Sequence, residues 1–164
     1  DVIKKQIGSH NLSNLNPAIN LARWISGIPI IYYPYGLQSA ATRFKSSLQE
    51  NAKSHAMTED VIEACHNGIV SWERPSSVQP ILLQGKDDYI KTKERFEIIK
   101  EFFIENNIDF KEINSPTGNI LTKTISLIYM LDYVSIYKAL LSEINPTPVL
   151  SIEYIKNKLD LSDK

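Results

Sequence analysis

The sequence has little of several features that define common classes of protein. Its one cysteine, Cys65, excludes an internal disulfide framework and a cysteine-rich zinc site. We therefore expect an intracellular, cytoplasmic protein. Lysine and arginine number 18 against 19 aspartates and glutamates, so no charge excess favours nucleic acid or anionic lipid. The apolar run over residues 25–35 contains two prolines and falls short of the ~20 residues that a membrane span needs.

Motifs for phosphate loops and metals are also missing. The six glycines are scattered, and they form neither a GxGxxG nor a Walker pattern. The first nine residues lack the apolar core of a signal peptide. Because residue 1 is aspartate rather than methionine, we expect a processed or excised piece of a longer protein. With 164 residues and 43% hydrophobic side chains, the chain suffices for one domain with its own core.

Strand-like and helix-like segments alternate along the chain. The apolar spacing predicts strands over 28–33, 54–58, 78–83 and 108–113, and helices over 16–25, 37–52, 85–105, 118–144 and 149–159. Residues 61–66 fit a short helix or a turn, and 69–72 are ambiguous. This alternation predicts an α/β fold with a parallel sheet covered by helices on both faces. Ligands bind such sheets at the carboxyl ends of the strands.

Two helices carry more specific expectations. Asp87 and Asp88 are expected in the first turn of the helix over 85–105, where negative charge complements the helix dipole. The helix over 118–144 is apolar over much of its circumference, so we expect it to be central and buried. Its apolar part over residues 120–141 fits a buried interface and a simple core helix equally well. We assign residues 16–164 to one domain and residues 1–15 to a lead-in or linker.

Glu50 and His66 are the first two candidates for chemistry. Glu50 ends a predicted helix, and a carboxylate there could be the general base that moves a proton between C1 and C2 of a sugar. It could equally be a solvated residue paired with Lys53. His66 precedes the turn signal Asn67-Gly68, and it fits either a proton shuttle or an exposed capping residue.

Lys156 and Cys65 are weaker candidates. Lys156 could hold a sugar hydroxyl or a developing negative charge, although Glu153 and Lys158 nearby are typical of a solvated helix face. Cys65 adjoins His66 in sequence, but neighbours usually point apart and no third group orients them. Read residue by residue, the sequence therefore indicates only an α/β domain.

Taken together, several blocks resemble one family. The chain resembles the C-terminal half of the bifunctional phosphoglucose/phosphomannose isomerases of archaea and some bacteria, which consist of two sugar isomerase (SIS) domains. The resemblance extends from about residue 16 to residue 159. The blocks occur in the right order and spacing: Glu50-Asn51-Ala52-Lys53, His66-Asn67, Trp72-Glu73, Leu131-Asp132-Tyr133-Val134-Ser135-Ile136-Tyr137 and Pro146-Thr147-Pro148-Val149.

The resemblance implies a fold, a reaction and three site residues. The fold is a flavodoxin-like three-layer α/β/α sandwich. Glu50 matches the catalytic base, His66 matches a histidine that assists ring opening across a dimer interface, and Lys156 matches a lysine that contacts the substrate. The substrate is a sugar phosphate, interconverted between glucose 6-phosphate or mannose 6-phosphate and fructose 6-phosphate. No cofactor, metal, nucleic acid or membrane is implied, and the expected assembly is a homodimer.

The sequence also departs from the family. The hydroxyls that bind the sugar phosphate, and an arginine that steadies the enediolate, belong to the first SIS domain, so we expect the chain to be inactive by itself. Locally, Ala64-Cys65 before His66 and Ser71 before Trp72 differ from the family pattern. Two other functions stay open: a non-catalytic SIS-type module that binds phosphosugars or regulates, and an interaction domain of a larger complex.

Overall fold

A four-stranded parallel sheet forms the centre of the molecule. The computed structural model describes residues 2–162, with side chains over 3–159. The strands are β1 (Ile28–Tyr33), β2 (Met57–Asp60), β3 (Val78–Gly85) and β4 (Lys111–Ser115), in the order β2-β1-β3-β4. Ile31 pairs with Thr58 on one side and with Ile81 on the other. All neighbouring strands are parallel, as the alternating pattern predicts.

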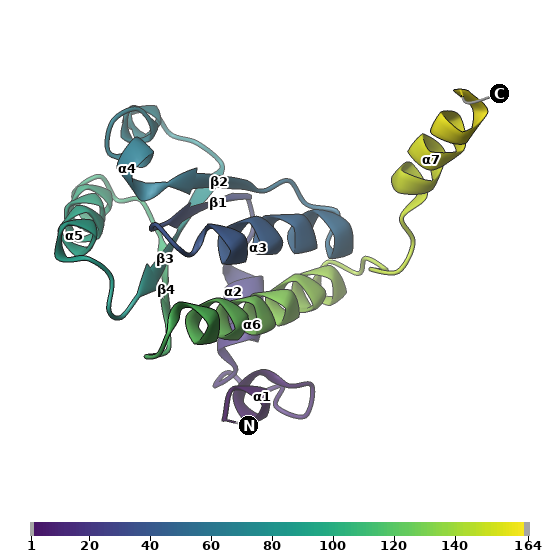
Figure 1. Ribbon diagram of the computed structural model, residues 1–164, viewed down its shortest axis with the longest axis horizontal. Coiled ribbons are helices and arrows are strands. Elements are labelled where there is room, and N and C mark those ends of the chain that lie inside the picture. Colours follow the sequence, from purple (N-terminus) through teal and green to yellow (C-terminus); the bar gives the residue numbers. More distant parts are fainter. Residues whose placement is uncertain (1, 163–164) are drawn as a thin grey trace.

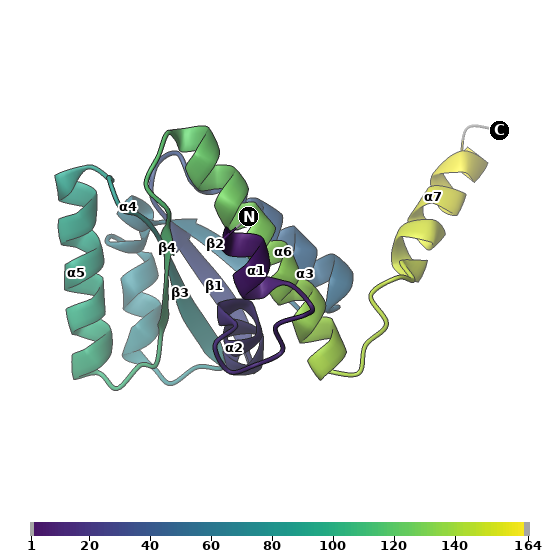
Figure 2. The same ribbon diagram turned by 90° about the horizontal axis from the view of Figure 1, so that it is seen from below.

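Helices cover both faces of this sheet (Figures 1 and 2). One layer holds α2 (Pro17–Trp24), α3 (Gln38–Asn51) and α6 (Ile120–Leu141), with α1 (Val2–Ile7) beside them; the other holds α4 (Val61–Ala64), the 3-10 helix η1 (Gly68–Glu73) and α5 (Ile90–Glu105). Ile31 and Ile81 face the first layer, whereas Tyr32 and Leu82 face the second. The predicted α/β fold with helices on both faces is therefore confirmed.

The chain before residue 16 is attached to the first layer. Asn16 caps α2, since its side-chain oxygen accepts hydrogen bonds from the Ala18 and Ile19 amides. Its side-chain amide donates to the carbonyl of Ile7 at 3.1 Å, and the Tyr137 hydroxyl donates to the same carbonyl at 2.7 Å. Because Ile7 is also buried, α1 packs on the domain rather than extending from it.

Two strands begin later than their apolar patterns predict. β2 starts at Met57 rather than at residue 54, and β4 starts at Lys111 rather than at residue 108. In both cases the chain leaves the preceding helix through a residue with a left-handed backbone, Lys53 (φ 53°) or Asn107 (φ 56°). The residues just after it belong to this helix end, so the strand begins later. The main-chain amide of Ile108, for example, donates to Phe103 and so closes α5.

The start of α5 also differs from the prediction. The helix begins at Ile90, so Asp87 and Asp88 precede it and its first turn has no acidic residue. The Asp88 carboxylate instead accepts a hydrogen bond from the Gly85 amide at 2.7 Å. Asp87 forms an ion pair with the buried Lys123 of α6 at 3.4 Å. Both aspartates therefore stabilise the connection after β3 rather than the helix dipole.

α6 is not buried all round, contrary to the prediction. Its inner side chains, among them Leu127, Leu131 and Val134, lie in the core, whereas several apolar residues on its outer side are exposed. By length and composition alone it is a helix that could cross a membrane, with a mean hydropathy of 1.3. A core helix meets the same criterion, and the inner side of α6 packs against α2, α3 and the sheet.

The last helix, α7 (Leu150–Ser162), extends away from the sheet and its covering layers (Figures 1 and 2). A linker with Pro146 and Pro148 separates it from α6. The side chains described along α7 are exposed. The contacts between α7 and the rest of the chain are therefore at the start of this helix, where the linker meets the end of α3.

Candidate functional site

Glu50 lies at the C-terminal end of α3, beside a pocket of about 520 Å³. Its side chain is exposed to this space. One wall comes from the end of α3 and the other from the linker and the first turn of α7. The lining residues are Ser46, Gln49, Glu50, Lys53, Pro148, Val149, Leu150, Ser151 and Ile152.

Lys53 connects the two walls of this pocket. Its ammonium group donates to the main-chain carbonyl of Glu50 at 2.5 Å, to that of Pro148 at 2.7 Å and to that of Pro146 at 3.4 Å. The sequence suggested a side-chain pair between Lys53 and Glu50, but this hydrogen bond goes to the Glu50 backbone. Lys53 thus attaches the linker before α7 to the end of α3, a role that residue type alone does not reveal.

Polar contacts fix α3 against α6 along the approach to Glu50. The guanidinium of Arg43 makes two hydrogen bonds of 3.1 Å to the Asp132 carboxylate, and the Ser47 hydroxyl donates to the same carboxylate at 2.6 Å. One turn further on, the Asn51 amide donates to the Ser135 hydroxyl at 2.8 Å. Since Arg43, Ser47 and Asn51 are four residues apart, they form one row on α3 that holds its end in place.

His66 lies in the other layer, after α4. Its imidazole is exposed, and its main-chain amide donates to the Glu63 carbonyl at 2.9 Å. A second pocket of about 450 Å³ adjoins the following residues, Asn67 and Gly68, and includes Glu59. Burial, followed by repulsion from Glu63, raises the pKa of the Glu59 carboxyl. This face therefore carries a partly desolvated carboxylate that sequence reasoning did not single out.

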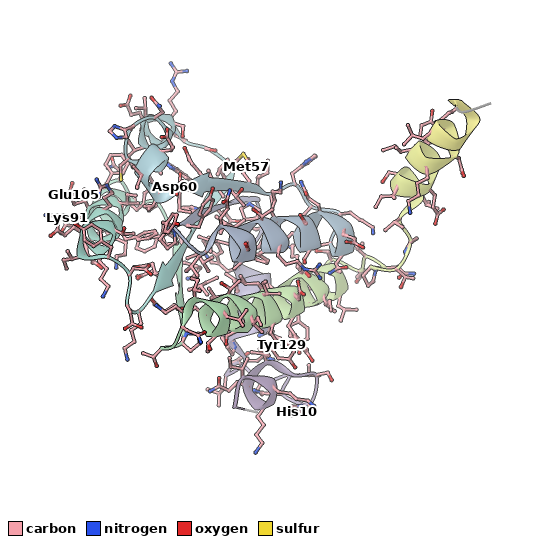
Figure 3. The ribbon with its side chains drawn as sticks, viewed as in Figure 1. His10, Met57, Asp60, Lys91, Glu105 and Tyr129 are labelled. Atoms are coloured by element: carbon pink, nitrogen blue, oxygen red, sulfur yellow. The ribbon has the colours of Figure 1, made fainter. Side chains whose placement is uncertain are left out.

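The sheet separates Glu50 from His66. β2 runs between them: Met57 begins the strand after the end of α3, and Asp60 ends it and caps α4 through the Ile62 amide (Figure 3). Glu50 thus lies near the amino-terminal edge of the sheet, not at the carboxyl edge where ligands of parallel sheets commonly bind. A single copy does not bring the two residues into one site.

Lys156 is exposed on α7 and does not line the Glu50 pocket. It follows Leu150, which does line it, by about 9 Å of helix axis at 1.5 Å per residue. α7 therefore begins at the pocket and carries Lys156 away from the body of this chain (Figure 1).

Cys65 and metal chemistry receive no support from the geometry. Cys65 is half-buried, and burial raises the pKa of its thiol more than nearby Arg95 lowers it, which disfavours the reactive thiolate. Within the part of the chain that the structure describes, no cluster of three or more histidine, cysteine, aspartate or glutamate side chains could hold a metal ion.

Solved structures of proteins named as sugar-phosphate isomerases share this fold. A glucose-6-phosphate isomerase like protein from Thermus thermophilus has a TM-score of 0.71 at 20% identity, over 88% of this chain and 50% of that one. A putative sugar-phosphate isomerase from Listeria monocytogenes has a TM-score of 0.61 at 9% identity, over 77% and 75% of the two chains. At these identities, the likeness shows the fold alone.

The chain belongs to the family described as the bacterial phospho-glucose isomerase C-terminal SIS domain, whose model matches residues 14–159. The bifunctional phosphoglucose/phosphomannose isomerase of Caldicellulosiruptor bescii is 34% identical over an alignment of 151 residues, and the match covers 89% of this chain and 44% of that protein. The enzyme of the same name from Aquifex aeolicus is 27% identical over 80% of this chain and 42% of its own length. The family resemblance is confirmed, and the chain spans less than half of these curated relatives.

Proposed function

We propose that this chain is the C-terminal half of a phosphoglucose/phosphomannose isomerase, which interconverts glucose 6-phosphate or mannose 6-phosphate with fructose 6-phosphate. The observation that carries the proposal is the position of Glu50 beside a pocket whose two walls Lys53 joins. This arrangement occurs in a chain that belongs to the isomerase family. A sugar phosphate bound there would meet an exposed carboxylate at the end of a firmly held helix.

Glu50 acts as the general base in this reaction. Its carboxylate removes the proton from C2 of the open-chain aldose while the C1 carbonyl oxygen takes up a proton from water, which gives the enediol. The carboxylic acid then returns its proton to C1, and the O2 hydroxyl releases its proton to water as the C2 carbonyl forms. The proton count is unchanged, so neither an oxidant nor a cofactor is required.

His66 and Lys156 join this site from other parts of the assembly. Since the sheet separates His66 from Glu50 within one copy, His66 would assist ring opening in the site of a second copy, in a homodimer. Lys156 would contact the substrate through α7, which starts at the Glu50 pocket. The hydroxyls that bind phosphate would come from a preceding SIS half. The complete enzyme would work in the cytoplasm without a metal, and this chain alone would be inactive.

Replacement of Glu50 tests the proposed base. We would join the N-terminal half of the Caldicellulosiruptor bescii relative to this chain, and we call the product the hybrid. Glu50→Gln should lower isomerase turnover by about 100- to 10,000-fold, because general base catalysis contributes that much. Binding of fructose 6-phosphate should stay largely intact, since Gln preserves the shape of the side chain.

Glu105→Gln is the matched control, because Glu105 is an exposed glutamate at the end of α5, on the other face of the sheet. It should leave turnover unchanged. If Glu50→Gln retained full turnover in an active hybrid, the base would lie elsewhere. If the hybrid bound the sugar phosphate without turning it over, the non-catalytic binding module would be the better description.

A further inference from the structure

The outer side of α6 carries an apolar stripe, which we call the α6 face. Its members follow one another at intervals of four or seven residues, so they share one side of the helix. Each is between 36% and 64% exposed. The α6 face consists of Leu121, Ile125, Tyr129, Ile136 and Leu140.

This stripe has almost no charge. The exposed residues of α6 are apolar apart from Thr122. Of its three charged residues, Lys123 is buried, Lys138 is half-buried, and Asp132 is bound to Arg43 and Ser47 of α3. Large apolar patches with few charges are typical of the central part of a protein interface.

The α6 face leads to the Glu50 pocket. α3 and α6 lie side by side and run in the same direction, so Leu140 and Glu50 are at the same end of the layer (Figure 1). Beyond the linker, the start of α7 adds the exposed side chains of Leu150, Ile152 and Tyr154. A partner lying on α6 would therefore reach both the pocket and α7.

We propose that the α6 face is the docking surface for the N-terminal SIS half of the same enzyme. The inference rests on the proposed function, and it names which surface joins the halves. The chain spans 44% and 42% of two curated relatives, which leaves a partner half of at least similar size. A half bound on α6 would lie next to Glu50, where the phosphate-binding hydroxyls are needed.

Charge favours a protein over a membrane as the occupant. The carboxylate of Asp132 and the guanidinium of Arg43 lie beside the stripe, and their side chains are 29% and 56% exposed. Lipid would remove water from this ion pair without offering hydrogen bonds, which is costly. A protein surface can supply polar partners at the same position.

Cysteine labelling tests the docking without reference to catalysis. In a Cys65→Ser background, Ile125→Cys and Ile104→Cys would be introduced singly into this chain and into the hybrid. Ile104 is an exposed control on α5, in the opposite layer. Ile125→Cys should react with a maleimide at least about 10-fold more slowly in the hybrid than in the chain, because a covered side chain reacts only when the halves separate. Ile104→Cys should react equally in both.

Several outcomes would overturn the inference. Equal labelling of Ile125→Cys in the chain and in a cooperatively unfolding hybrid would leave the α6 face uncovered by the N-terminal half. Protection in the chain alone that grows with its concentration would identify a second copy as the occupant. Protection by vesicles of phosphatidylcholine and phosphatidylglycerol would identify a membrane.

A second measurement covers the case in which the hybrid does not fold. The two halves would be mixed as separate polypeptides, and their affinity measured by calorimetry. Leu121→Asp with Ile125→Asp should weaken binding at least about 100-fold, since a buried unpaired charge is costly. Ile98→Asp with Ile104→Asp on α5 should not weaken it. Equal affinities, or no binding by the wild-type chain, would contradict the inference. Loss of turnover by Glu50→Gln in a protected hybrid separates this test from that of the proposed function.

Discussion

The two longest helices, α5 and α6, lie on opposite faces of the sheet and differ in what they expose. α5 exposes acidic residues such as Glu94, Glu97 and Glu101, and lysines pair with the first two. α6 exposes a stripe of apolar side chains instead. Both helices bury an inner side against the sheet, through Phe96 and Phe103 in α5 and through Leu131 in α6.

The difference distinguishes a charged outer side, on α5, from an apolar outer side, on α6. On the outer side of α5, charged residues lie between the exposed isoleucines, so this surface is well solvated. The outer side of α6 has far fewer such charges, so the exposure of its apolar side chains in the single chain is unfavourable. The apolar stripe and the Glu50 pocket belong to the same layer, which links the surface to the proposed active site.

The largest expected effect contrasts the two sides of α6. Leu131→Ala should lower the free energy of unfolding of this chain by about 2–5 kcal/mol, because Leu131 is fully buried. Leu121→Ala should change it by less than about 0.5 kcal/mol, because that side chain is exposed. Urea unfolding followed by circular dichroism measures both. Equal losses would mean that the outer stripe is already packed in the single chain.

The next largest effect is expected for Lys53→Gly, which should lower isomerase turnover by loosening one wall of the Glu50 pocket. The glycine accepts the left-handed backbone of residue 53, so α3 keeps its end, but the ammonium that holds the linker is lost. Turnover of the hybrid should fall by about 10- to 100-fold, since small misplacements of groups around a substrate reduce rates by such factors. The melting temperature should not fall.

Lys53→Arg is the rescue control, because it retains a cation that can reach the same carbonyls. It should recover more turnover than Lys53→Gly. Full activity of Lys53→Gly would show that the linker needs no attachment to α3, and would weaken the pocket account.

Asp132→Ala tests the polar contacts on the α6 side against an ion pair on the α5 side. Asp132→Ala should lower the free energy of unfolding by about 1–3 kcal/mol, because it leaves the buried Ser47 hydroxyl without its acceptor. Glu94→Ala removes only an exposed pair with Lys91 and should cost less than about 0.5 kcal/mol. Chemical denaturation of the two variants measures both losses in the free energy of unfolding. Similar losses would contradict a larger stabilising role for the Asp132 contacts.

The smallest effect concerns Cys65, in the layer of α5. Because burial raises the pKa of its thiol in the folded chain, the thiolate should form at higher pH there than in the unfolded chain. The pH profile of iodoacetamide labelling should therefore shift upward in the folded protein. The same raised pKa means that any stability from the neutral thiol is fully present below the unfolded pKa and is lost as the pH rises through the higher folded pKa. A labelling profile that is unshifted, or shifted to lower pH, would contradict a raised pKa of the Cys65 thiol.

Local signals in the sequence predicted much of the fold. Asn16-Pro17 marks the start of α2, and the apolar run of residues 78–83 marks β3, because capping and strand patterns depend on neighbouring residues. The starts of β2 and β4 were misplaced because Lys53 and Asn107 adopt a left-handed backbone, which neither residue type demands. For α6 the sequence left a core helix and an interface helix open, because apolar content does not distinguish the two.

The candidate site was less predictable. Sequence blocks indicated Glu50, His66 and Lys156 together, yet the sheet places Glu50 and His66 on opposite sides. Such separation depends on the tertiary fold and the assembly, not on spacing along the chain. The attachment by Lys53 was equally hidden, because the linker carbonyls that it binds lie 93 and 95 residues away in sequence.

A coupled assay for glucose 6-phosphate formed from fructose 6-phosphate tests the central claim most directly. It would be run with this chain alone and with the hybrid. The account predicts no turnover by the chain and clear turnover by the hybrid, because the phosphate-binding groups come from the other half. Turnover by the chain alone would contradict the split site, since every group needed for catalysis would then lie within these 164 residues.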